Sequence, residues 1–273
     1  LALAQWAAKT KADIIVLCGV HFMGETAKIL CPDKKVLVPD LNAGCSLADS
    51  CPATEFAEFV KQHPGHTVIS YVNTTAAVKA VTDVVVTSTN ARQIVESFPE
   101  GTPMIFGPDR NLGNYINSIT GRNMLLWDGA CHVHEQFSLE KILSLKKQYP
   151  NAEVITHPEC KQPVIQVSDF VGSTAALLKY TIKSDAKQFI VATESGVIHE
   201  MRKRSPDKEF IPAPPNDSTC ACNECNFMRL NTMEKLYNCL KFEMPEIFVD
   251  EEVQKKAIKP IKKMLEISEK LGL

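Results

Sequence analysis

The stretch "PGHTVISYVN", residues 64–73, recurs later in the chain as "PNAEVITHPE", residues 150–159. A second pair, "VTDVVVTSTN" at 81–90 and "VSDFVGSTAA" at 167–176, is separated by the same interval of 86 residues. Short apolar runs bounded by turn residues are typical of buried strands. Because similarity at a fixed interval indicates homologous structural units, the sequence predicts a duplicated strand-containing unit.

A longer pattern occurs three times, beginning at residues 15, 104 and 189. Each copy predicts a buried strand, a short helix, a turn, a second strand and a loop with cysteine. Strands that alternate with helices imply βαβ units and parallel sheets. We therefore predict an α/β fold of three homologous α/β units with parallel sheets, arranged around a shared centre.

The sequence also gives expected boundaries for the three units. We expect the first unit at residues 1–52 with adjoining C-terminal helices, the second at 53–140, and the third, followed by the C-terminal helices, at 141–273. The opening "LALAQWAAKTKAD" is typical of the later turns of an amphipathic helix and has no cap before it. We therefore expect the first unit to be incomplete and the natural protein to begin upstream.

Composition excludes several classes of protein. The 273 residues are 45% apolar and carry a net charge of −2, which favours a folded chain with a sizeable core. No basic patch points to nucleic acid or to an anionic membrane. Neither a spanning apolar segment nor a signal peptide is visible, so we expect a cytoplasmic protein.

Ten cysteines are the main chemical signal. In a reducing compartment, clustered cysteines bind metals more often than they form disulfides. Cys45 and Cys131 lie 86 residues apart, and a third loop, "TCACNECNFM" at 219–228, has three more cysteines. Ligands of α/β sheets bind beyond the carboxyl ends of strands, so one thiol from each unit can reach a shared site. We interpret four others as buried structural residues: Cys18, Cys31, Cys160 and Cys239.

Three convergent thiolates suit zinc or an iron–sulfur cluster. A zinc ribbon needs two CxxC pairs, whereas this chain has one compact CxCxxC run. A [4Fe–4S] cluster that only transfers electrons has four cysteine ligands. With three ligands, one iron stays open and can act as a Lewis acid, which favours a dehydratase or condensing enzyme. The alternatives are a non-catalytic redox or regulatory iron–sulfur protein and a zinc-stabilised binding module.

The whole chain resembles the quinolinate synthase family. The matching segments are "VPDLNAGCSLADSCP" (38–52), "YVNTTAAVKAVTDVVVTSTNA" (71–91), "IFGPDRNLGNYI" (105–116), "CHVHEQF" (131–137), "HPEC" (157–160), "DFVGST" (169–174), "TESGVIHEM" (193–201) and "CNFMRLNTMEKLY" (225–237). The resemblance implies a transferase of de novo NAD biosynthesis that condenses iminoaspartate with dihydroxyacetone phosphate to quinolinate. It also implies coupling to L-aspartate oxidase.

The resemblance further implies a pseudo-threefold arrangement of the three α/β units around a central cluster site. This site would hold a [4Fe–4S] cluster with one open iron. Its three ligands would be Cys45, Cys131 and Cys225. Cys220 and Cys222 would be neighbours of the third ligand, and a disulfide between them stays an open question.

Several polar residues are implied to contact substrate. Tyr71 and Asn73 would orient carboxylate and carbonyl oxygens, and the phenol can donate a proton. Ser88, Ser173 and Thr174 would bind a carboxylate or phosphate, although simple helix capping explains such hydroxyls equally well.

His157 and Glu159 stand at the repeat positions of Tyr71 and Asn73 and are expected to transfer protons together with Tyr71. His134 is a further candidate for the same role. Glu194 and His199 are expected to support the site. We interpret the other histidines as structural or solvent-facing: His21, His63, His66 and His132.

Overall fold

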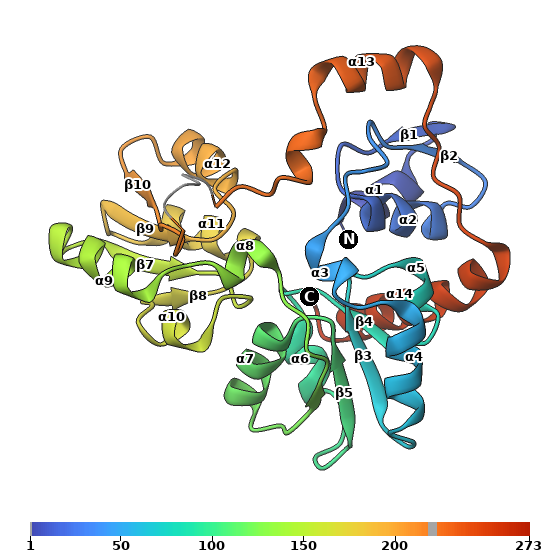
Figure 1. Cartoon of the computed structure of the whole chain (residues 1–273), viewed down its shortest axis with the longest axis horizontal. Helices are drawn as coiled ribbons and strands as arrows, with labels where there is room; N and C mark the ends of the chain where they lie inside the picture. The colour runs from blue at the N-terminus through green and yellow to red at the C-terminus, as the bar shows by residue number, and fades with distance from the viewer. Residues whose placement is uncertain (1, 218–222) are drawn as a thin grey trace. The chain divides into compact units, whose positions relative to one another are not determined.

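A computed structural model of the chain describes residues 2–217 and 223–273. It contains three sheets, and the strands within each sheet run parallel (Figure 1). Helices separate successive strands along the chain, as parallel pairing requires. The expected α/β class is therefore confirmed, whereas the boundaries of three units and their pseudo-threefold arrangement stay predictions.

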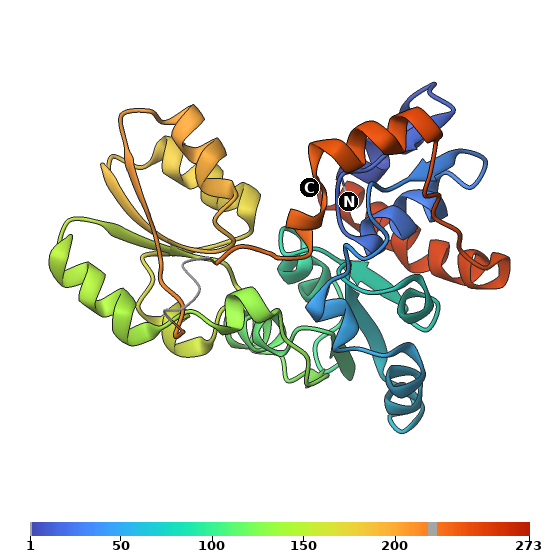
Figure 2. The ribbon, with the colours of Figure 1, turned by 45° about the horizontal axis from the view of Figure 1, so that its top comes forward.

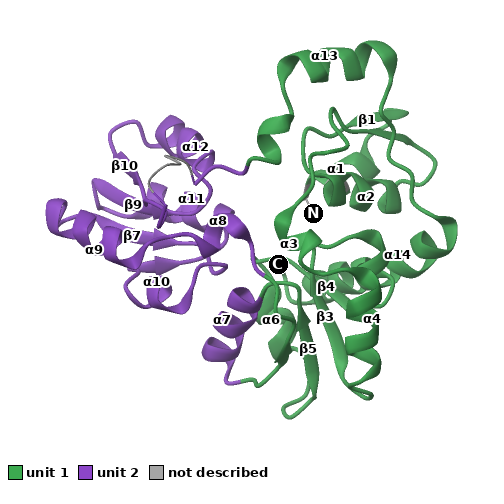
Figure 3. Cartoon of the chain, in the orientation of Figure 1, with its two compact units in different colours: residues 1–109, 122–129, 226–273 green, residues 110–121, 130–225 purple. Residues whose placement is uncertain are grey.

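The described residues form two compact units, shown in different colours in Figure 3. The first unit comprises residues 1–109, 122–129 and 226–273, and the second comprises 110–121 and 130–225. The first unit holds two of the sheets and the second unit holds the third sheet.

The smallest sheet consists of β1 (Ile14–Val16) and β2 (Lys35–Leu37), which are joined by α2 (His21–Leu30) and preceded by α1 (Ala2–Lys9). Residues from near the end of the chain complete its core. The Ile247 amide donates to the Val36 carbonyl at 2.8 Å, and the Ile247 side chain is buried in the same cluster. A Cβ on Gly24 of α2 would lie 2.9 Å from Ile247, so this close approach requires glycine.

The second sheet has the order β4-β3-β5-β6. Its strands are β3 (Thr67–Tyr71), β4 (Val84–Val86), β5 (Met104–Gly107) and β6 (Leu125–Leu126). The connecting helices are α4 (Ala53–Lys61), α5 (Ala76–Lys79), α6 (Ala91–Glu96) and α7 (Arg110–Thr120). The C-terminal helix α14 (Glu251–Lys270) contacts β4 and α5 of this part, and also α2.

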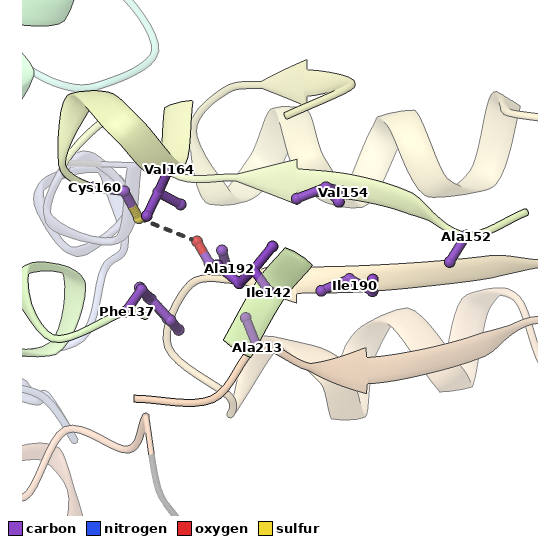
Figure 4. Close-up of a cluster of buried hydrophobic side chains, with 9 residues drawn as sticks. All are labelled: Phe137, Ile142, Ala152, Val154, Cys160, Val164, Ile190, Ala192 and Ala213. Carbon is purple, nitrogen blue, oxygen red and sulfur yellow. Dashed lines mark hydrogen bonds between the residues drawn. The ribbon is translucent and has the colours of Figure 1, made fainter. Parts of the chain in front are cut away.

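The third sheet has the order β10-β9-β7-β8. Its strands are β7 (Glu153–Thr156), β8 (Phe170–Val171), β9 (Gln188–Ala192) and β10 (Glu209–Pro212). Its helices are α9 (Leu139–Gln148), α10 (Gln162–Gln166), α11 (Thr174–Lys183) and α12 (Val197–Arg204). Figure 2 shows helices on both faces of this sheet. Two apolar clusters therefore form, one on each face; that with α9 and α10 is drawn in Figure 4.

The remaining elements are one-turn or connecting segments. They are α3 (Ser46–Asp49), α8 (His132–Glu135), the 3-10 turn η1 (Met228–Leu230) and α13 (Met233–Phe242).

The repeat seen in the sequence is present in individual hydrogen bonds. Asp83 accepts the amide of Val68 at 2.8 Å, and Asp169 accepts the amide of Val154 at 2.7 Å. A hydroxyl pair also recurs: Ser70 with Thr82 at 2.7 Å, and Thr156 with Ser168 at 2.5 Å. Each pair of bonds is displaced by the same 86 residues. The repeat in the sequence therefore corresponds to a repeat of the same hydrogen bonds in the two sheets.

We expect the two repeated carboxylates to contribute similarly to stability. Asp83→Ala and Asp169→Ala each leave the amide of a buried valine without its acceptor, which costs about 1–3 kcal/mol. Urea unfolding measures the change. The control is Asp207→Ala, because its ion pair with Lys187 joins side chains that are 63% and 69% exposed and is screened by solvent, so its loss should change stability little. Equal losses in all three variants would contradict the role of the repeat.

Candidate functional site

The structure places the predicted polar residues where strands end. In the first unit Tyr71 is the last residue of β3, Asn73 follows two residues later, and Ser88 follows β4. Asn73 and Val72 help to line a cavity of about 130 Å³ together with Phe22 of α2. Polar groups at the carboxyl end of a parallel sheet are well placed to contact a ligand.

The second unit places His157 and Glu159 directly after β7, both 3% exposed. The turn that carries them is anchored through Cys160, whose buried thiol donates to the Ala192 carbonyl at 3.4 Å (Figure 4). The His157 amide donates to the same carbonyl at 3.1 Å. Because β9 holds this turn twice, the two side chains have little freedom to leave the sheet edge.

Three side chains of the second unit meet at this edge. His134 Nδ1 lies 3.0 Å from Glu159 Oε2, and His157 Nδ1 lies 3.6 Å from Glu159 Oε1. The rings of His134 and His157 stack with centroids 4.7 Å apart. The structure thus brings His157 and Glu159 together, as the sequence predicted, and adds His134 at equally short range.

The electrostatics of His157 follow from its burial. The pKa of its imidazole is lowered to about 4, mainly because burial removes the charged form from water. The Glu159 carboxylate acts in the opposite direction and raises the pKa, whereas His134 lowers it further. The Glu159 amide donates to His157 Nδ1 at 3.3 Å, which assigns the ring proton to Nε2. His157 is therefore a neutral imidazole at neutral pH, with its ring proton on Nε2.

The hydroxyls predicted to bind an anion divide into two kinds. Ser173 is 4% exposed and caps α11, where its side chain accepts the Ala176 amide at 3.3 Å. Helix capping, the alternative open from the sequence, therefore occurs at Ser173. Thr174 is the first, exposed residue of α11, and Ser88 is half-buried.

The three candidate cysteine ligands are thiols of intermediate exposure. Cys45 and Cys131 each immediately precede a one-turn helix, α3 and α8, and neither side chain caps it. The Cys225 amide donates to Glu194 Oε1 at 3.3 Å, while the supporting role expected of Glu194 stays a prediction. Cys220 and Cys222 lie outside the described residues.

The cysteines interpreted as structural are mostly buried, namely Cys31, Cys160 and Cys239. Cys18 is exposed, so its expected burial is wrong. It lies two residues beyond β1, where the chain has already left the two-stranded sheet.

Lys79 was not anticipated from the sequence, although a lysine within the apolar "AAVKAV" run was a visible signal. The side chain is completely buried, and its ammonium donates to the carbonyls of Val72, at 2.9 Å, and Thr74. These two carbonyls flank Asn73. Burial lowers the pKa of Lys79 to about 8, while Glu25 and Cys45 raise it. Lys79 thus holds the backbone on both sides of Asn73, a residue predicted to contact the substrate.

Comparison with known proteins identifies the family. The family model described as quinolinate synthetase A protein matches residues 1–266. The quinolinate synthase of Thermosynechococcus vestitus is 58% identical over 268 residues, which cover 98% of this chain and 84% of the relative. That of Chloroherpeton thalassium is 57% identical over 98% of this chain and 83% of the relative.

The chain belongs to the quinolinate synthetase A family. The expectation of a quinolinate-forming enzyme of NAD biosynthesis is thereby confirmed, and nothing in the comparisons supports the alternative of a non-catalytic redox protein. Family membership and the donor set of Cys131, His134 and Glu159 indicate a metal cofactor. Across the described residues, every helix is too short or too polar to cross a membrane.

The burial of Lys79 predicts a pH dependence of stability. Its pKa is about 8 in the folded chain and near 10.5 in the unfolded chain, so between these values the unfolded chain binds more protons. The free energy of unfolding should therefore rise with pH across this window, by up to about 3 kcal/mol from this group.

Lys79→Met removes the titrating group, so the stability of wild type relative to this variant should increase from pH 8 to pH 10.5 in urea unfolding. Lys35→Met is the control, because that lysine is exposed and its hydrogen bond to Glu243 raises its pKa instead. A constant difference between wild type and Lys79→Met would show that Lys79 titrates normally.

Proposed function

We propose that the chain condenses iminoaspartate with dihydroxyacetone phosphate, forming quinolinate, phosphate and water. One observation carries this proposal beyond family membership. Within the second unit, the thiol of Cys131 shares one group of donor atoms with His134 and Glu159, beside the neutral imidazole of His157. A soft metal ligand and groups able to transfer protons therefore meet at one sheet edge.

The metal cofactor we propose is a [4Fe–4S] cluster held by Cys45, Cys131 and Cys225. Thiolates are the usual ligands of such clusters, and all three thiols belong to loops beyond paired parallel strands. In this proposal each of three α/β units provides one ligand. When bound, the cluster would supply an iron without a cysteine ligand, which acts as a Lewis acid on a substrate oxygen.

The proton transfers are assigned to residues of this chain. Condensation requires removal of a proton from a carbon next to a carbonyl, and later steps require protonation of departing hydroxyl groups. The Glu159 carboxylate is the base of this pair, and the His157 Nε2–H is the donor. Tyr71 offers a phenol as a further acid, and Asn73 an amide that orients carboxylate oxygens.

The phosphate and carboxylate groups need hydroxyl and amide donors. Ser88, Thr174 and the N-terminal turn of α11 are proposed to supply them, because a helix N-terminus favours an anion. Ser173 contributes by capping this helix, and its side chain is thereby held in place. Supply of iminoaspartate by an L-aspartate oxidase and a cytoplasmic location complete the proposal.

The ligand assignment predicts which thiols iron requires. Cys45→Ser, Cys131→Ser and Cys225→Ser should each lose cluster iron and visible absorbance after anaerobic reconstitution, because each removes a thiolate ligand. Cys239→Ala should retain both, since that thiol is buried in α13. Cys220→Ala and Cys222→Ala should also retain the cluster. Retention in Cys225→Ser with loss in Cys222→Ala would overturn the assignment.

The proton-transfer assignment predicts the effect of removing His157. His157→Ala should lower kcat for quinolinate formation by about a hundred- to ten-thousandfold while iron content is unchanged. Tyr71→Phe should reduce kcat as well, whereas His63→Ala should not, because His63 bonds the Phe59 carbonyl on α4 instead. The assay uses reconstituted protein, iminoaspartate and dihydroxyacetone phosphate without oxygen.

Two outcomes would count against this part of the proposal. Wild type that carries the cluster but forms no quinolinate would contradict the function itself. Near-native kcat in both His157→Ala and Tyr71→Phe would leave the function intact and move the proton transfers to other residues.

A further inference from the structure

Cys131, His134 and Glu159 form a compact group of three different donor atoms. Among the residues that the structure describes, this is the one group of three or more metal-binding side chains, and its donor atoms lie within 4.8 Å of one another. Cys131 precedes α8, His134 is part of that turn, and Glu159 follows β7. All three belong to the second unit.

The imidazole of His134 is oriented by a contact of its Nε2 atom, on the side of the ring away from Glu159. Its Nε2 lies 3.1 Å from Thr193 Oγ1, and Thr193 is itself only 3% exposed. Metal-binding histidines usually have their second ring nitrogen bonded in this way, which fixes the tautomer and aims the other nitrogen at the ion. Thr193 therefore directs His134 Nδ1 toward Glu159.

The atom that faces Glu159 is poorly satisfied. His134 Nδ1 lies 3.0 Å from the carboxylate oxygen, yet in the described part of the chain it is a buried nitrogen with no hydrogen-bond partner. If Nε2–H donates to Thr193, the lone pair of Nδ1 points toward an anionic oxygen, which is unfavourable at this burial. A cation between the two atoms would turn this repulsion into two coordination bonds.

The donor set selects the kind of cation. One thiolate, one imidazole and one carboxylate suit zinc or ferrous iron, whereas magnesium and calcium prefer oxygen ligands alone. In a tetrahedral zinc site with bonds of about 2.0–2.3 Å, neighbouring ligand atoms are about 3.3–3.8 Å apart. The donor atoms here lie from 3.0 Å, between His134 and Glu159, up to 4.8 Å apart, so small side-chain rotations in both directions give that spacing. Three protein ligands leave a fourth position for water.

We propose that Cys131, His134 and Glu159 bind a single divalent transition-metal ion, zinc or ferrous iron, in the protein that lacks its cluster. The proposal of a mononuclear site depends only on the geometry of the second unit. It has one consequence, which rests on the proposed function. Cys131 cannot bind this ion and the cluster at the same time, so zinc at the site blocks cluster assembly.

Cobalt is a direct probe of the site. Cluster-free full-length chain with reduced thiols is titrated with Co²⁺ without oxygen, and thiolate-to-cobalt absorption is recorded. We expect one ion per chain with tetrahedral bands. Cys131→Ser should remove the sulfur band, and His134→Ala and Glu159→Gln should weaken binding at least tenfold. Thr193→Val should weaken it by about ten- to a hundredfold through the orientation of His134.

Matched controls separate this site from the cluster site. His132→Ala alters the neighbouring histidine of α8, and Cys160→Ala alters the thiol next to Glu159; both should bind cobalt as wild type does. Cys45→Ser and Cys225→Ser should lose the cluster but retain cobalt binding. His134→Ala should show the reverse, with weak cobalt binding and intact cluster absorbance. Failure of the proposed function would thus leave the cobalt results unchanged.

Three results would overturn the inference. One is unchanged cobalt affinity in both His134→Ala and Glu159→Gln. Another is loss of the sulfur band in Cys45→Ser, which would place the ion among the three cysteines. The third is the absence of a sulfur band in wild type, in which case His134 and Glu159 form only an ion pair. The isosteric Glu159→Gln, checked by circular dichroism, remains informative if His134→Ala does not fold.

Discussion

Parallel pairing of short buried strands is the constraint on which the candidate site depends. Strands of two to five residues are too short to carry a pocket along their faces, but parallel pairing gathers their carboxyl ends at one edge. Backbone hydrogen bonds between neighbouring segments continue one residue past the strand itself: the His157 amide, directly after β7, still donates to the Ala192 carbonyl at the end of β9. Polar side chains in the following turns are therefore placed almost as firmly as core residues.

Burial decides what those side chains can do. The buried carboxylate of Glu159 lies beside two stacked imidazoles, so its charge interacts mainly with these immediate neighbours. His157 is kept neutral by desolvation, while His134 is positioned by a hydroxyl of the adjacent strand end. The two stacked histidines thus differ: burial keeps the imidazole of His157 neutral, and the Thr193 hydroxyl sets the orientation of His134.

The sequence predicted the α/β class and the repeat because both depend on local patterns of apolar and turn residues. The pairing of His157 with Glu159 was visible for the same reason, since they are two residues apart on one turn. The closeness of His134 to Glu159 was not, because it depends on how α8 meets the end of β7. Lys79 was missed because its two closest acceptors are backbone carbonyls, which no residue pattern reveals. Cys18 was misjudged because an apolar strand before it does not guarantee a covered position after it.

The segment around Ile247 has a consequence for biosynthesis. Its backbone and side chain complete the core of β1 and β2, although more than half of the chain is translated between them. The second compact unit, by contrast, draws nearly all its residues from one continuous stretch, 130–225. Domains generally fold as units during synthesis. Strands β1 and β2 must therefore wait, with apolar surface uncovered, until the segment around Ile247 has been made, whereas the second unit can fold before then.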